Sequence, residues 1–134
     1  MKIWIAVASI MLLFSGCAGV GGGTPTKNPL NENTYRRISM DEAIQMIAEE
    51  ENYIILDVRR ADEFASGHIP GAINVPNESI GEKPIPELPD KSQLILVYCR
   101  SGNRSKQASA KLAAMGYTNI VEFGGILDWP GAVE

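Results

Sequence analysis

The chain has 134 residues, and its 12 lysines and arginines against 16 acidic side chains give a formal net charge of −4 at pH 7. No stripe of basic residues runs along the sequence, so we expect no nucleic-acid partner. The chain has two cysteines, Cys17 and Cys99, and the first follows an apolar leader. We therefore expect no disulfide within the folded part of the chain.

Residues 1–16 are typical of a secretory signal peptide. After Lys2, the apolar run from Ile3 to Phe14 is too short for a membrane-spanning helix, which needs about 20 residues. The run ends in "LFSGC", which resembles the lipobox of bacterial lipoproteins. That resemblance implies that Cys17 is acylated and anchors an extracytoplasmic protein to a membrane. Cleavage after Ala18, which would give a soluble secreted protein, is the alternative.

The anchor can be tested with a Cys17→Ser variant. Acyl chains contribute about 0.8 kcal/mol per buried methylene to membrane binding. We expect the wild type to fractionate with membranes and to incorporate a fatty-acid label, and the variant to remain an unprocessed precursor or become soluble. An unlabelled wild type whose N-terminus follows Ala18 would instead be a freely secreted protein.

Residues 17–34, rich in Gly, Pro, Asn and Thr, are typical of a flexible tether. Residues 35–134 are long enough for one domain with a single core. Ser39 and Glu42 have the spacing of a capping box, which predicts a helix that begins at Met40. Two further helices are expected over 61–66 and 105–116, and the Pro-containing segment 77–92 is expected to be mostly loop.

Five short strands are expected between these helices. They cover residues 35–38, 53–58, 72–76, 93–99 and 119–123. The runs 53–58 and 93–99 are almost wholly apolar, as in parallel strands that are buried on both faces. This alternation predicts an α/β fold with a largely parallel sheet and right-handed crossovers.

The sequence "CRSGNRS" follows the apolar strand that ends at Cys99. Ligands of parallel sheets bind beyond the carboxyl ends of the strands, where both Cys99 and Asp57 are expected. A glycine-containing loop that enters a helix forms a nest of backbone amides, which favours the nucleophilic thiolate. A cysteine at a strand end can also be an inert buried side chain, but two nearby arginines argue against that reading. Candidate substrate-binding residues are Arg100, Ser101, Gly102, Asn103, Arg104 and Ser105.

Three motifs, "LDVRRADEFASGHIPGAINVP", "CRSGNRS" and "GGILDW", together resemble the rhodanese family of sulfurtransferases. The resemblance covers residues 35–134 and implies a five-stranded, mostly parallel sheet flanked by helices. It implies that Cys99 carries sulfane sulfur as a persulfide, from a donor such as thiosulfate to a thiol or protein acceptor. It also implies that Asp57 organises the neighbouring loop. We expect Arg59 either to pair with Asp62 or Glu63 or to join the positive rim.

The spacing of the loop distinguishes two chemistries. Cysteine phosphatases of this fold carry five residues between cysteine and arginine, whereas four separate Cys99 from Arg104. The tighter nest suits the outer sulfur of a persulfide better than a phosphate. A non-catalytic sulfur carrier or partner-binding module remains the alternative, and a redox sensor is a third reading. We expect a monomer without cofactor or metal, and we expect His68 to be structural rather than catalytic.

Overall fold

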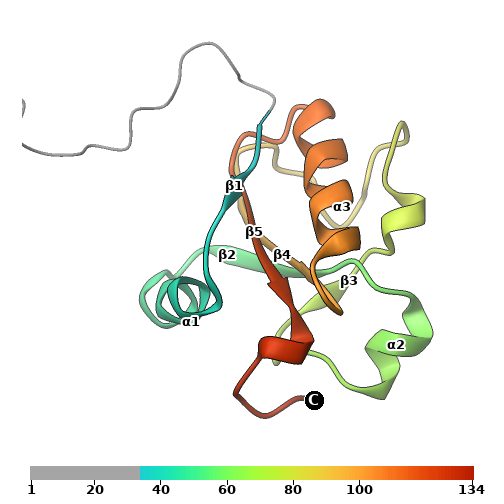
Figure 1. Cartoon of the computed structure of the whole chain (residues 1–134). Coiled ribbons are helices and arrows are strands. Elements are labelled where there is room, and N and C mark those ends of the chain that lie inside the picture. The colour runs from blue at the N-terminus through green and yellow to red at the C-terminus, as the bar shows by residue number, and fades with distance from the viewer. Residues whose placement is uncertain (1–33) are drawn as a thin grey trace, which may run out of the picture.

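The computed structural model describes residues 34–134, which form a five-stranded parallel sheet with helices on both faces (Figure 1). The predicted leader, Cys17 and the tether up to residue 33 lie outside the described residues. The strand order is β1-β5-β4-β2-β3. The strands are β1 (Arg36–Arg37), β2 (Tyr53–Asp57), β3 (Ile73–Asn74), β4 (Leu94–Cys99) and β5 (Ile120–Gly125). The predicted fold class is therefore confirmed.

None of the helices between residues 34 and 134 is both long enough and apolar enough to span a bilayer.

Three α-helices and one short 3₁₀ turn connect the strands, and a second 3₁₀ turn follows β5. The helices are α1 (Met40–Glu49), α2 (Ala61–Ser66) and α3 (Asn103–Ala114), and the turns are η1 (Asn77–Ser79) and η2 (Ile126–Asp128). The predicted capping box is present, because Ser39 Oγ accepts from the Glu42 amide and the Glu42 carboxylate accepts from the Ser39 amide. Helix α1 accordingly begins at Met40, as predicted.

The predicted start of α3 at Ser105 is two residues too late. Gly102 has φ +112°, a left-handed conformation that L side chains rarely adopt, and it turns the chain from β4 directly into the helix. Asn103 and Arg104 therefore belong to the first turn of α3. The strand predicted over 72–76 shortens to two residues, whereas β5 extends to Gly125.

The two faces of the sheet carry separate cores. On one face, Val97 and Cys99 of β4 pack with Ala108 and Leu112 of α3. On the other, Leu96 and Tyr98 pack with the apolar side of α1 and with the segment after α2. Figure 1 shows α1 and α3 on opposite sides of the strands. Because side chains alternate along a strand, Cys99 faces α3.

Candidate active site

Cys99 ends the central strand β4, between β5 and β2, where the chain turns into α3. Its side chain is almost fully buried, with the residue 1% exposed. The Gly102 amide donates to Cys99 Sγ at 3.0 Å, and the thiol lies 3.4 Å from Ser105 Oγ. The positive end of the α3 dipole therefore faces the sulfur, an arrangement that stabilises a negatively charged thiolate.

The end of β5 packs against the loop that joins β4 to α3. Gly125 packs so closely that a Cβ there would overlap the carbonyl group of Arg100 and crowd the amide of Ser101. The Leu127 amide of η2 also donates to the Arg100 carbonyl, at 3.2 Å. The "GGILDW" motif thus contributes a backbone platform on which residues 100 and 101 rest.

A buried carboxylate, which the sequence reading missed, lies beneath the same loop. Glu122 on β5 is 1% exposed, and its Oε1 accepts from Ser105 Oγ at 2.7 Å and from the Gly124 amide at 2.9 Å. Its Oε2 lies 3.3 Å from Nε of Arg37, at the exposed edge of the sheet. The alternation of side chains along β5 could have predicted this position. Ile120 and Glu122 point to one face of the sheet, the face of Cys99, while Val121 and Phe123 point to the other.

Replacing Glu122 should destabilise the domain. In Glu122→Leu, the Gly124 amide loses its acceptor, and an unsatisfied buried group costs about 1–3 kcal/mol. The Ser105 hydroxyl loses its closest acceptor but can still donate to the Gly102 carbonyl at 2.9 Å. We expect the free energy of unfolding in urea to fall by about 1–3 kcal/mol. Glu122→Gln keeps an acceptor oxygen and is the matched control, because the exposed Arg37 remains hydrated. Equal stability of Glu122→Leu and the wild type would contradict the role of Glu122 as a buried hydrogen-bond acceptor at this loop.

Asp57 lies at the centre of a buried network at the end of β2. Its carboxylate accepts from the Arg59 amide at 2.9 Å, from Arg59 Nη2 at 2.7 Å and from Tyr98 Oη at 2.8 Å. The Tyr98 hydroxyl in turn accepts from the Ile69 amide. The pKa of Tyr98 is raised, mainly because the hydroxyl is buried. These contacts join β2, β4 and the loop before β3, which fits the organising role expected of Asp57.

The prediction that Arg59 pairs with Asp62 or Glu63, or joins a positive rim, is wrong. Its guanidinium is buried against Asp57 and donates to the Gly67 carbonyl at 2.7 Å, so it contributes nothing to a positive rim. The physical reason is that Asp57, the nearer carboxylate, is fully buried and needs a cation. Arg60 takes the place predicted for Arg59, because its Nε lies 3.0 Å from Asp62 and 3.6 Å from Glu63.

The two arginines of the loop occupy different environments. Arg104 forms a bidentate ion pair with Glu63 of α2, with Nη1–Oε1 and Nη2–Oε2 distances of 2.7 and 3.0 Å. These hydrogen bonds raise the pKa of Arg104 and lower that of Glu63. Arg100 is exposed and, within residues 34–134, its side chain has no hydrogen bond or ion pair. Ser101 and Asn103 are also exposed, whereas Gly102 and Ser105 are buried.

His68 has a local structural environment. Its ring stacks on Phe64, with centroids 3.8 Å apart and an interplanar angle of 8°. Its Nδ1 lies 3.0 Å from the Phe64 carbonyl oxygen, and its Nε2 lies 3.5 Å from a carboxylate oxygen of Glu134. Both ring nitrogens therefore have partners other than Cys99.

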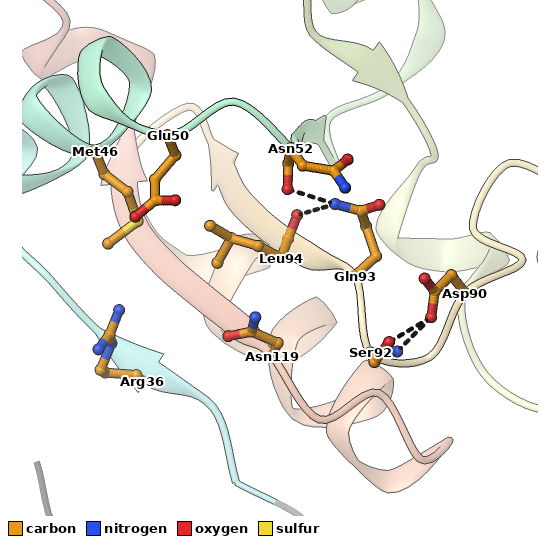
Figure 2. A pocket seen from close by; sticks show the side chains of 9 residues that line it. All are labelled: Arg36, Met46, Glu50, Asn52, Asp90, Ser92, Gln93, Leu94 and Asn119. Carbon is orange, nitrogen blue, oxygen red and sulfur yellow. Dashed lines mark hydrogen bonds between the residues drawn. The ribbon is translucent and has the colours of Figure 1, made fainter.

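A polar hollow of 410 Å³ lies at the opposite end of the sheet from Cys99 (Figure 2). Asn52, Gln93 and Asn119, which line it, directly precede β2, β4 and β5. Figure 2 shows that Gln93 donates to the carbonyls of Asn52 and Leu94. This hollow is at the amino ends of the strands and takes no part in the Cys99 site.

The fold and the loop define an α/β domain with a buried cysteine at the end of its central strand, where the thiol accepts a hydrogen bond from the Gly102 amide. A family model described as "Rhodanese-like domain" matches residues 39–132, and the chain belongs to that family. It is 38% identical over 73 residues to thiosulfate sulfurtransferase PspE of Escherichia coli, which covers 54% of this chain and 70% of PspE. It is 37% identical over 93 residues to a sulfurtransferase of Allochromatium vinosum, covering 69% and 85% of the two chains.

A solved structure described as a rhodanese with anions from E. coli matches the fold as well. Its TM-score is 0.56 at 34% sequence identity, and the match covers 61% of this chain and 96% of the other.

Proposed function

We propose that the protein is a sulfurtransferase that carries sulfane sulfur on Cys99 as a persulfide. The observation that carries this proposal is the buried Cys99 thiol, which accepts from the Gly102 amide at the N-terminus of α3. Its family membership and the names of its relatives, which include a thiosulfate sulfurtransferase, support the same reaction class.

The first half-reaction loads the cysteine. The Cys99 thiolate attacks the terminal sulfur of a donor such as thiosulfate, so an Sγ–S bond forms while the donor's S–S bond breaks. Sulfite leaves with the electron pair of that bond. The Gly102 amide and the α3 dipole stabilise the negative charge on sulfur throughout, and the exposed Arg100 attracts the anionic donor.

The second half-reaction transfers the outer sulfur from Cys99 to an acceptor. A nucleophilic acceptor attacks the outer sulfur, and the Cys99 thiolate leaves with the electron pair of the Sγ–S bond. Cyanide becomes thiocyanate in the assay, and a thiol becomes a persulfide. The Gly102 amide and the N-terminus of α3 favour negative charge at the end of β4 in both states of the cysteine, so they would serve both half-reactions.

The surroundings of Cys99 favour sulfur transfer over phosphate hydrolysis. With Cys99 1% exposed, a slender terminal sulfur reaches it more easily than a tetrahedral phosphate with three further oxygens. The guanidinium of Arg104, which would hold the phosphate oxygens in a phosphatase, is already bidentate with Glu63. We therefore expect negligible turnover of aryl phosphates.

Initial-rate kinetics with thiosulfate and cyanide test the proposal. A persulfide intermediate predicts a ping-pong pattern, with parallel double-reciprocal lines as the second substrate is varied. A sulfur carrier without turnover would instead release one equivalent of thiocyanate and stop. Hydrolysis of aryl phosphates faster than thiocyanate formation would overturn the assignment.

A further inference from the structure

Glu63 neutralises one of the two arginines that the loop presents. Its carboxylate faces the Arg104 guanidinium in a fork-to-fork arrangement and is only 18% exposed. Both donor positions of that fork are occupied, so Arg104 cannot offer the same geometry to an incoming anion without breaking the pair. Helix α2 therefore sets how much positive charge remains at the entrance to Cys99.

The charges around the loop nearly cancel. Arg60 pairs with Asp62 and Glu63 on α2, and Arg104 pairs with Glu63. Glu78 on η1 adds a further negative charge that acts on Arg104. Arg100 is the one cation of this group without a charged partner among the described residues. A donor with two negative charges thus meets a single uncompensated cation.

An exposed apolar residue is joined by a backbone hydrogen bond to the residue that carries this cation. Leu127 is 65% exposed, and its amide is bonded to the Arg100 carbonyl, which fixes it against the loop. The loop and the turn bonded to it therefore expose one unpaired cation and one apolar side chain, a combination that suits the carbon skeleton of an organic thiol better than an inorganic dianion.

We propose that Glu63 is a specificity-determining residue, which disfavours dianionic donors such as thiosulfate and leaves the site suited to persulfides of thiols. This inference rests on the proposed sulfurtransferase function. In the preferred loading step, the Cys99 thiolate attacks the outer sulfur of R–S–SH. The Sγ–S bond forms, the donor's S–S bond breaks, and R–S⁻ leaves with the electron pair. The products are Cys99–S–SH and the thiolate, so no oxidant or reductant is required.

The first test uses charged and neutral alkylating agents on the full chain, with modification counted on the peptide that contains Cys99. The ratio of the iodoacetate rate to the iodoacetamide rate reports the electrostatic potential at the sulfur and cancels changes in thiolate content. In Glu63→Gln this ratio should rise about fivefold at low salt, and the gain should shrink at high salt. Asp62→Asn is the matched control, because it removes one negative charge from the same helix but leaves the ion pair between Glu63 and Arg104 intact. It should change the ratio less than twofold.

The second test compares donors. Glu63→Gln should raise kcat/KM for thiosulfate about tenfold and leave loading by cysteine persulfide within twofold of the wild type. Glu63→Asp should restore the wild-type preference. An unchanged alkylation ratio in Glu63→Gln, or equal effects of Glu63→Gln and Asp62→Asn, would overturn the role of Glu63. Failure of both donors to load Cys99 would overturn the sulfurtransferase proposal instead, while the alkylation ratios would still test Glu63.

Discussion

Cys99→Ser should abolish thiocyanate formation from thiosulfate and cyanide while the domain stays folded. Serine keeps an acceptor for the Gly102 amide, but its hydroxyl cannot form the persulfide. We expect a loss of at least about 10³-fold in kcat/KM, as is typical when a covalent nucleophile is removed. Circular dichroism and urea unfolding should show a native fold, with a stability change of about 1–2 kcal/mol or less.

A separate assay of sulfur uptake distinguishes the loss of the nucleophile from a general loss of structure. The variant should also fail to take up sulfur from cysteine persulfide, a donor that does not carry the double negative charge of thiosulfate. Substantial residual turnover in folded Cys99→Ser would mean that another group carries the sulfur.

Gly125→Ala should have the next largest effect, although residue 125 has no side chain and does not contact the sulfur. A Cβ at this position would overlap backbone atoms of Arg100 and Ser101, which cannot rotate away as a flexible side chain could. The loop must therefore shift and carry the Gly102 amide away from Cys99 Sγ. A displacement of about 1 Å in a reacting group can lower the rate about 10²-fold, and overpacking costs about 1–3 kcal/mol of stability.

Gly81→Ala is the matched control for this substitution. Gly81 has an ordinary φ, and nothing lies within 4 Å of the Cβ that alanine would add there. Its kcat/KM and urea midpoint should remain close to those of the wild type. If Gly125→Ala behaves like Gly81→Ala, the loop does not depend on the β5 platform.

Features of the fold that have a local cause could be predicted from the sequence. The capping box at Ser39 and Glu42 is a spacing of three residues, and it placed the start of α1 correctly. The apolar runs before Asp57 and Cys99 predicted two buried parallel strands, because a strand covered on both faces shows no alternation. The start of α3 was misplaced because the left-handed Gly102 already completes the turn.

Features of the site that depend on distant residues were missed. Glu63 and Arg104 are 41 positions apart in the sequence, and their pairing follows from how α2 and α3 meet at the carboxyl end of the sheet. Gly125 is needed only because the β4–α3 loop rests on it. Arg59 was misassigned although its partner is only two positions away, because burial selects the partner: Asp57 is fully buried at a strand end, whereas Asp62 on α2 is exposed. Sequence spacing alone does not rank such partners.

The mass of the protein after exposure to a sulfur donor tests the central claim most directly. The full chain would be treated with thiosulfate or cysteine persulfide, weighed intact, digested and then treated with cyanide. We predict a gain of one sulfur atom, located on the peptide that contains Cys99, and its loss to cyanide with one equivalent of thiocyanate. No gain in mass from either donor, or the same gain in Cys99→Ser, would contradict the assignment of Cys99 as the sulfur carrier.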